Sequence, residues 1–194
     1  PGTAVRAALE AQNIPSVAAG AGSVYATSAG NDWLTLLEAL EQPHRSGRVR
    51  AAALTPFLGR SAADLEAGGE TLTDELGSLL RNWADLLQTR GVAALLELSF
   101  AEQGLPGRLL AEIDGERRLT DLRHLGEGLQ AAVVDEGLGL AALVEWLRRR
   151  RAESAADKSV ERVRRLDSDA AAVQVMTLHV SKGLQYPVVY LPFA

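Results

Sequence analysis

Helical spacing of apolar side chains, from about residue 55 to residue 152, constrains the fold more than any other feature of this sequence. Apolar residues recur there every three or four positions, which is the pattern of amphipathic helices. One such stripe, opened by Thr71 or Thr73, comprises Leu72, Leu76, Leu79, Leu80, Trp83, Leu86 and Leu87. Short connections between antiparallel neighbours are suggested by Gly91, Gly104, Gly115 and Gly137. The spacing therefore predicts a helical domain in the middle of the chain.

The two ends of the chain follow a different pattern. Residues 1–18 predict a helix that leads into a short strand, and a further helix is predicted to begin at Asn31 or Asp32. Near the C-terminus, VQVMTL (173–178) and VVYLPF (188–193) are apolar or β-branched at nearly every position, which is typical of buried strands in a parallel sheet. We therefore predict a mainly α fold with a small β part.

Composition and charge exclude several classes of protein. With 47% hydrophobic and 23% charged residues among 194, the chain can bury a core and differs from a disordered segment. Its net charge of −5 argues against a globally basic nucleic-acid binder. Because there is no cysteine, disulfides and cysteine-based metal sites are excluded, and a reducing, cytoplasmic setting is expected.

Neither a membrane nor export is indicated. No stretch approaches the roughly 18 consecutive apolar residues of a membrane span, so we expect no membrane partner. The chain starts at Pro1 and stops in the apolar run VVYLPFA, from which we expect a piece of a longer protein.

Sequence motifs for autonomous catalysis are absent. Neither a phosphate-binding GxxxxGK[ST] loop nor GxGxxG, HExxH or GxSxG occurs. His44, His124 and His179 stand far apart in the sequence, without the spacing of metal ligands. We therefore expect no catalytic residue and no metal site in this chain.

A polar junction follows the first C-terminal strand. Hydroxyl, imidazole and ammonium groups and a glycine meet at this strand end, contributed by Thr177, His179, Ser181, Lys182 and Gly183. Such donors suit phosphate groups, and glycine permits close approach. A polar loop in which Ser181 caps a helix explains the same residues equally well, so spacing alone leaves both interpretations open.

Two groups of basic residues carry weaker signals. Between residues 145 and 166, eight basic side chains face four acidic ones, and a solvated helix end is favoured over a phosphate-contacting patch. For Arg117 and Arg118 we favour ion pairs with Glu112, Asp114 or Glu116 over DNA contact.

Core packing is predicted for the tryptophans on apolar stripes, Trp33, Trp83 and Trp146.

The run VQVMTLHVSKGLQYPVVYLPF (173–193) closely resembles motif V of the UvrD/Rep/PcrA/RecB branch of superfamily 1 DNA helicases. In that motif a strand ending in T-[IL]-H is followed by x-[SA]-K-G-L-E and a second strand. Two upstream stretches are also similar to this branch, AVRAALEAQNIPSV and GERRLTDLRHLGEGLQ, the latter being typical of RecB-type subunits. The chain thus resembles a RecB-like helicase subunit of the exodeoxyribonuclease V beta-subunit type.

This resemblance implies a domain layout and a set of contacts. Residues 1–54 and 161–194 would be pieces of the RecA-like 2A domain, and residues 55–160 would form the helical 2B domain inserted into it. Contacts with single-stranded DNA are implied for Thr177, His179, Ser181 and Lys182, and nucleotide-facing positions for Gly183 and Gln185. The family usually carries Glu where Gln185 stands, and the amide keeps hydrogen-bonding capacity but loses the charge.

The resemblance also implies a function for the parent protein. It would be an ATP-dependent DNA helicase in double-strand-break repair and recombination, using ATP and Mg on single-stranded or duplex-end DNA with RecC- and RecD-like subunits. Because motifs I, Ia, II, III and VI are missing from this chain, we expect the piece alone to be inactive and to bind no cofactor. A helical protein-interaction module without enzymatic activity and a stand-alone DNA-binding regulator are the alternatives.

Overall fold

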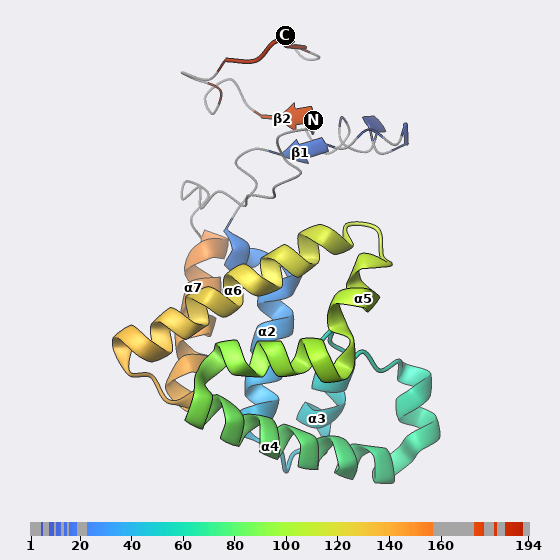
Figure 1. Cartoon of the computed structure of the whole chain (residues 1–194), viewed down its shortest axis with the longest axis vertical. Helices are drawn as coiled ribbons and strands as arrows, with labels where there is room; N and C mark the ends of the chain where they lie inside the picture. Colours follow the sequence, from blue (N-terminus) through green and yellow to red (C-terminus); the bar gives the residue numbers. More distant parts are fainter. Residues whose placement is uncertain are drawn as a thin grey trace. The chain divides into compact units, whose positions relative to one another are not determined.

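The computed structural model describes residues 5, 8–9, 11–12, 14, 16–18, 23–156, 173–176, 181 and 185–191. The chain forms two compact units, one from Pro1–Gly22 with Glu161–Ala194 and the other from Ser23–Val160. Helices dominate the described residues, and the two strands are three residues long each (Figure 1). The predicted mainly α fold with a small β part is therefore confirmed.

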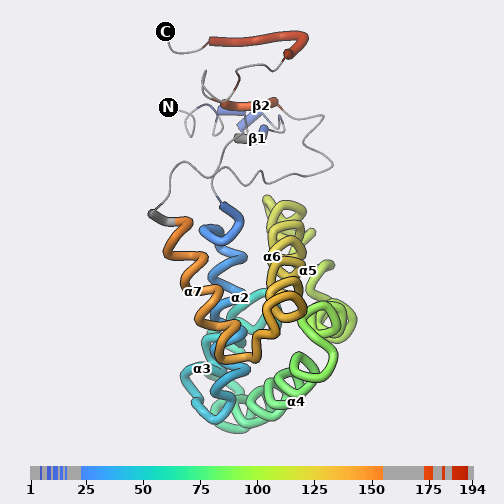
Figure 2. Tube along the Cα trace, turned by 90° about the vertical axis from the view of Figure 1, so that its left-hand side faces the viewer, coloured from blue at the N-terminus to red at the C-terminus, as the bar shows by residue number. Residues whose placement is uncertain are grey.

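The helical unit is arranged around one central helix. Its elements are the 3₁₀ helix η1 (Val24–Ala26) and the helices α2 (Ser28–Glu41), α3 (Ser46–Ala53), α4 (Ala62–Gln103), α5 (Leu105–Leu110), α6 (Gly115–Glu136) and α7 (Leu140–Ala156). Helix α2 packs against α3, α4, α6 and α7, and it lies between its neighbours in both ribbon views (Figures 1 and 2). No helix in the described part combines the length and apolar character that crossing a bilayer requires.

The helical unit begins earlier in the chain than residue 55. Helices α2 and α3 fall in the range 1–54 that the resemblance assigns to 2A, yet both pack within the helical unit. Helix α2 also begins before the predicted Asn31 or Asp32, because Thr27 takes the N-cap position. The assignment of the two units to 2A and 2B domains stays a prediction.

Trp33 of α2 lies at the centre of the core. Its side chain is 0% exposed, and its indole N–H donates to the Leu122 carbonyl of α6 at 2.9 Å. The indole also meets the ring of Phe57 edge to face, with 4.7 Å between ring centroids. Trp83 and Trp146 are buried as well, so the predicted core packing of all three tryptophans is confirmed.

Helix α4 changes direction at two glycines. Ser61 and Asp64 form a capping box at the N-terminus of α4, upstream of the predicted start at Thr71 or Thr73. The predicted start instead falls just after the bend at Gly69, where the second segment of α4 begins. Gly69 and Gly91 have positive φ values of 56° and 83°, so α4 consists of three straight segments. Figure 1 shows the resulting bends. The predicted stop at Gly91 corresponds to the second of them.

The segment after Gly91 is anchored by a side chain from α6. Its Ala93 N–H donates to Gln130 Oε1 at 3.1 Å. A Cβ atom on Gly91 would lie 2.6 Å from the same oxygen. With φ of 83° and ψ of −179°, this position also has backbone angles that glycine alone adopts without strain.

Charged side chains tie the helices together at their surface. Glu38 of α2 pairs with Arg48 of α3 and with Arg148 of α7. Nearer the start of α2, Asp32 lies 3.8 Å from the guanidinium of Arg118 on α6. Burial raises the pKa of Asp32, opposed by the positive charges of Arg118 and then Arg151. Within the described part of the chain, Asp32 Oδ2 accepts no hydrogen bond.

The first prediction concerns the second bend of α4. Replacing Gly91 by Ala should lower the free energy of unfolding by about 2 kcal/mol, because the new Cβ meets Gln130 and the backbone becomes strained. Urea denaturation of the chain measures this loss. Gly107→Ala in α5, where a Cβ would meet no neighbour, is the matched control and should cost nothing. An unchanged midpoint for Gly91→Ala would contradict this account.

The second prediction concerns the pH dependence of stability. Because the folded pKa of Asp32 lies above its unfolded value, its favourable contribution is fully present at low pH and is lost as pH rises through the folded pKa. Asp32→Asn is uncharged at every pH, so it should be at least as stable as the original chain at pH 7 and less pH-dependent above 3.8. Urea titrations at several pH values provide the test. A loss above about 1 kcal/mol at pH 7 would show that the attraction to arginine dominates.

Candidate nucleic-acid interface

The unit formed by Pro1–Gly22 and Glu161–Ala194, called the sheet unit below, contains a pair of parallel strands. Strand β1 (Ser16–Ala18) pairs with β2 (Val173–Val175), with Ser16 opposite Val173 and Ala18 opposite Val175. The strand predicted near the N-terminus and the first of the two strands predicted near the C-terminus therefore exist, and they are parallel. Ligands of open α/β sheets bind beyond the carboxyl ends of such strands, and the polar junction follows β2 directly.

The described residues contain only part of the predicted site. Ser181 lies in a turn and is half-buried, and the side chain of Gln185 is exposed. Thr177, His179, Lys182 and Gly183 lie outside the described residues. The DNA and nucleotide contacts, and the alternative of a helix capped by Ser181, therefore stay predictions.

The apolar run after the junction differs from its prediction. Residues 188–191 form no strand, and Val188, Val189, Tyr190 and Leu191 are all at least 66% exposed. The predicted buried strand is thus wrong for this stretch, because an apolar run becomes a strand only where a neighbouring backbone pairs with it. Strand β2 is also only half-buried, with Val173 being 43% exposed.

The arginine run in α7 is largely engaged within the helical unit. Arg148 pairs with Glu38 and Glu145, and Arg150 lies over the ring of Trp146. Arg151 donates to the backbone carbonyls of Tyr25 and Thr27, at 2.8 and 3.4 Å. These contacts argue against a phosphate-contacting patch here. They also differ from the favoured interpretation of a solvated helix end, because Arg148, Arg150 and Arg151 each contact a named partner within the helical unit. The rest of the basic window, residues 157–166, lies outside the described part.

Ion pairing is also the outcome for Arg118. It pairs with Glu112 and lies near Asp32, which agrees with the ion pairing that was favoured over DNA contact.

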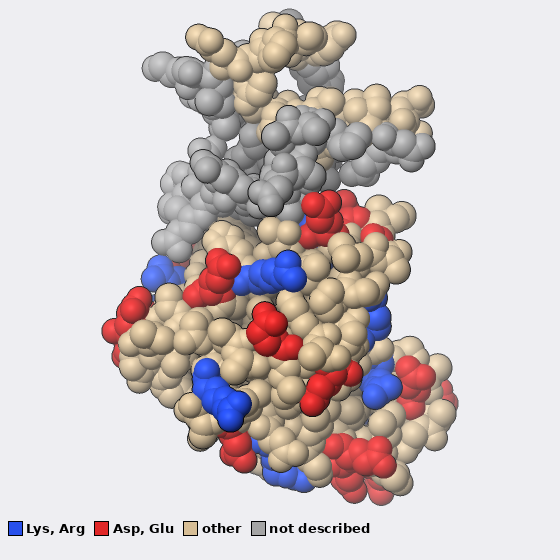
Figure 3. All heavy atoms as spheres, viewed as in Figure 1, with Lys and Arg blue, Asp and Glu red and all other residues tan. Residues whose placement is uncertain are grey.

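Acidic and basic side chains of the helical unit are interspersed on the face shown in Figure 3. Residues 23–160 contain 15 basic and 21 acidic residues. No group of three potential metal ligands occurs among the described residues.

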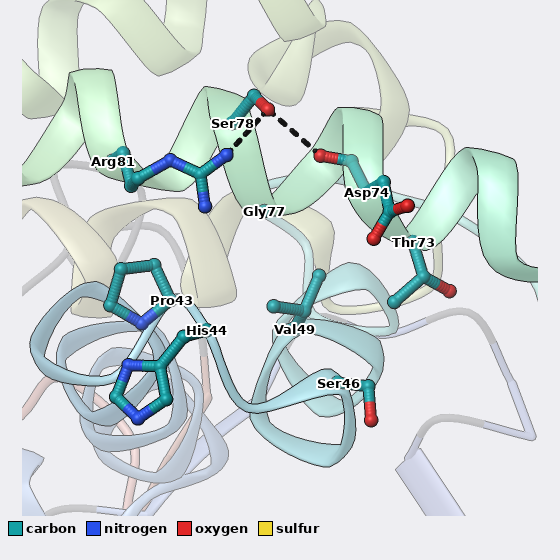
Figure 4. Close-up of a pocket in the computed structure, with 9 residues that line it drawn as sticks. All are labelled: Pro43, His44, Ser46, Val49, Thr73, Asp74, Gly77, Ser78 and Arg81. Carbon is teal, nitrogen blue, oxygen red and sulfur yellow. Dashed lines mark hydrogen bonds between the residues drawn. The ribbon is translucent and has the colours of Figure 1, made fainter.

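A hollow of about 450 Å³ was not anticipated from the sequence (Figure 4). It lies where the turn between α2 and α3 approaches α4, and its polar lining includes His44, Asp74, Ser78 and Arg81. A Cβ atom on Gly77 would lie 3.1 Å from the Pro43 carbonyl oxygen, so glycine permits this close approach. Since the two segments are distant in the sequence, only tertiary packing brings these residues together.

Comparison with known proteins supports the resemblance carried by the motif. No protein-family model matches the chain. The RecBCD enzyme subunit RecB of Mycolicibacterium smegmatis is 53% identical over 98% of the chain, and that of Escherichia coli is 37% identical over 97%. A more distant relative, an ATP-dependent helicase/nuclease from Listeria welshimeri, is 23% identical over 95%.

The chain spans 17% of the length of the Mycolicibacterium smegmatis protein and 16% of that from Escherichia coli. The similarity nevertheless covers both units, because it extends over nearly the whole chain. The resemblance of this sequence to RecB-like helicase subunits is therefore confirmed along nearly its entire length.

Proposed function

We propose that this chain is a segment of a RecB-like, ATP-dependent DNA helicase, in which the junction after β2 supplies the motif V contacts with single-stranded DNA. The observation that carries the proposal is the 53% identity to a RecB subunit over 98% of the chain. The strand pairing supports it, because the run 173–193 begins with the parallel strand β2, and ligands of open α/β sheets bind beyond the carboxyl ends of such strands.

The proposed DNA contacts divide by chemistry. Thr177 and Ser181 offer hydroxyl donors to phosphate oxygens, and Lys182 offers a positive charge. His179 can donate to the backbone or stack against a base. These groups would bind the DNA strand without cleaving a bond, so the proposed role of this chain is DNA binding. Closure of the two RecA-like domains would move these contacts along the DNA.

ATP and Mg would be bound mainly by other parts of the parent protein. The sequence contains no phosphate-binding GxxxxGK[ST] loop. At the edge of the nucleotide site, this chain would provide Gly183 and Gln185. The exposed amide of Gln185 can hydrogen-bond a ribose hydroxyl, although it lacks the charge of the glutamate usual in this family.

Assembly is the second part of the proposal. The relatives are named as subunits of a RecBCD enzyme, and we propose that the parent likewise works in the cytoplasm with RecC- and RecD-like subunits on duplex ends, in break repair and recombination. The helical unit would act as the 2B accessory domain. An interaction module without enzymatic activity is the competing function.

The third prediction tests the motif in the full-length parent. Thr177→Ala combined with His179→Ala should lower DNA-stimulated ATPase activity and unwinding at least about tenfold, because two strand contacts are lost. ATPase activity without DNA should change little. Arg149→Gln on α7 is the control, since Arg149 is exposed and makes no ion pair within the described part.

Two results would reject this assignment. Unchanged DNA-stimulated ATPase and unwinding in the double variant would remove the proposed strand contact. A parent protein that shows neither DNA-stimulated ATPase nor unwinding with the original residues in place would favour the interaction module.

A further inference from the structure

The hollow between the α2–α3 turn and α4 contains one arginine, Arg81, that makes no ion pair within the described part of the chain. Arg81 Nη2 donates to Ser78 Oγ at 2.7 Å, and Ser78 Oγ in turn donates to the Asp74 carbonyl at 2.9 Å. These two hydrogen bonds orient the Arg81 side chain, which lies on the same side of the hollow as Pro43 and His44 (Figure 4). Within the described part of the structure Arg81 has no ion pair, so most of its N–H donors stay available.

A second depression continues the hollow along the turn. It is lined by residues 44–48 and shares His44 and Ser46 with the first. Arg48 is already paired with Glu38, but Arg45 is exposed and makes no ion pair among the described residues. His44 and Ser46 therefore line both depressions, and each depression adds one arginine that makes no ion pair among the described residues, Arg81 in the first and Arg45 in the second.

The donors in this concave surface match one class of ligand. Arginine forks, an imidazole and a hydroxyl are the groups that hold phosphate oxygens in proteins. Asp74 lines the same hollow and would repel an anion, but it lies with Thr73 at the end opposite Arg81 and His44 (Figure 4). The ligand is thus placed at the end formed by Arg81 and His44.

The charge of the surroundings sets the size of the ligand. Acidic residues outnumber basic ones in residues 23–160, whereas the two depressions together are lined by three arginines and one carboxylate, that of Asp74. A long run of phosphates would be repelled by the rest of the unit, whereas one or two phosphate groups are not. The hollow, at about 450 Å³, has room for such a group.

We propose that Arg81, His44 and Arg45 bind a phosphate group where the hollow and the second depression meet at His44, either free in a small molecule or at a single position of a nucleic acid. This site is separate from the junction after β2, and its existence does not depend on the helicase function of the parent.

NMR titration of the 194-residue chain tests the proposal. Inorganic phosphate should shift the backbone amide signals of residues 44–48 and 77–81 in a saturable way. Arg81→Gln should weaken this binding at least about tenfold, because a charged hydrogen-bonding partner is removed. Arg90→Gln is the matched control, since Arg90 is exposed on the same helix but does not line the hollow.

Further arms identify the source of the phosphate and guard against a folding defect. A short single-stranded or duplex oligonucleotide that shifts the same amide signals at a tenfold lower concentration than phosphate would identify the ligand as a nucleic acid. If phosphate binds but neither oligonucleotide binds more tightly, the ligand is a small phosphorylated molecule. His44→Ala, at an exposed turn position, should weaken binding even if Arg81→Gln fails to fold. No saturable shift with phosphate or either oligonucleotide, or equal binding by the original chain and a folded Arg81→Gln variant, would overturn the proposal.

Discussion

Burial of Trp33 is the interaction on which the helical unit depends. A buried indole N–H without a partner would cost free energy, and the Leu122 carbonyl removes that cost by accepting a hydrogen bond at 2.9 Å. The bond fixes α2 against α6, while the ring contact with Phe57 fixes the loop after α3. Helix α2 also packs against α3, α4 and α7, and the remaining helix of this unit, α5, packs on α4 and α6.

The same packing explains why the arginine run of α7 is not free to bind DNA. Arg148 reaches the Glu38 carboxylate on α2, and Arg151 reaches the carbonyls of Tyr25 and Thr27, just before that helix. The guanidinium groups thereby join α7 to α2 and to the segment that precedes it. Structural use of these charges leaves the proposed strand contacts to the junction after β2.

Periodic features of the sequence predicted the fold best. The apolar stripes predicted the buried tryptophans, a short apolar run after a helix predicted β1, and a β-branched run predicted β2, because burial and local spacing are properties of neighbouring residues. Features made by distant residues could not be predicted in this way. Three such features join segments far apart in the sequence. They are the approach of Gly77 to Pro43, the hydrogen bond from Ala93 N–H to Gln130 and the ion pair of Glu38 with Arg148. The run at 188–191 was mistaken for a buried strand because composition does not show whether a pairing partner is present.

The central claim is that the junction after β2 grips single-stranded DNA in the parent helicase, and photocrosslinking tests it most directly. A single strand carrying 4-thiothymidine would be bound to the full-length protein, irradiated and digested, and the crosslinked peptides identified by mass spectrometry. The account predicts crosslinks within residues 173–191, strongest at positions 177–182. A protein that unwinds DNA under the same conditions but yields no crosslink in this range would contradict it.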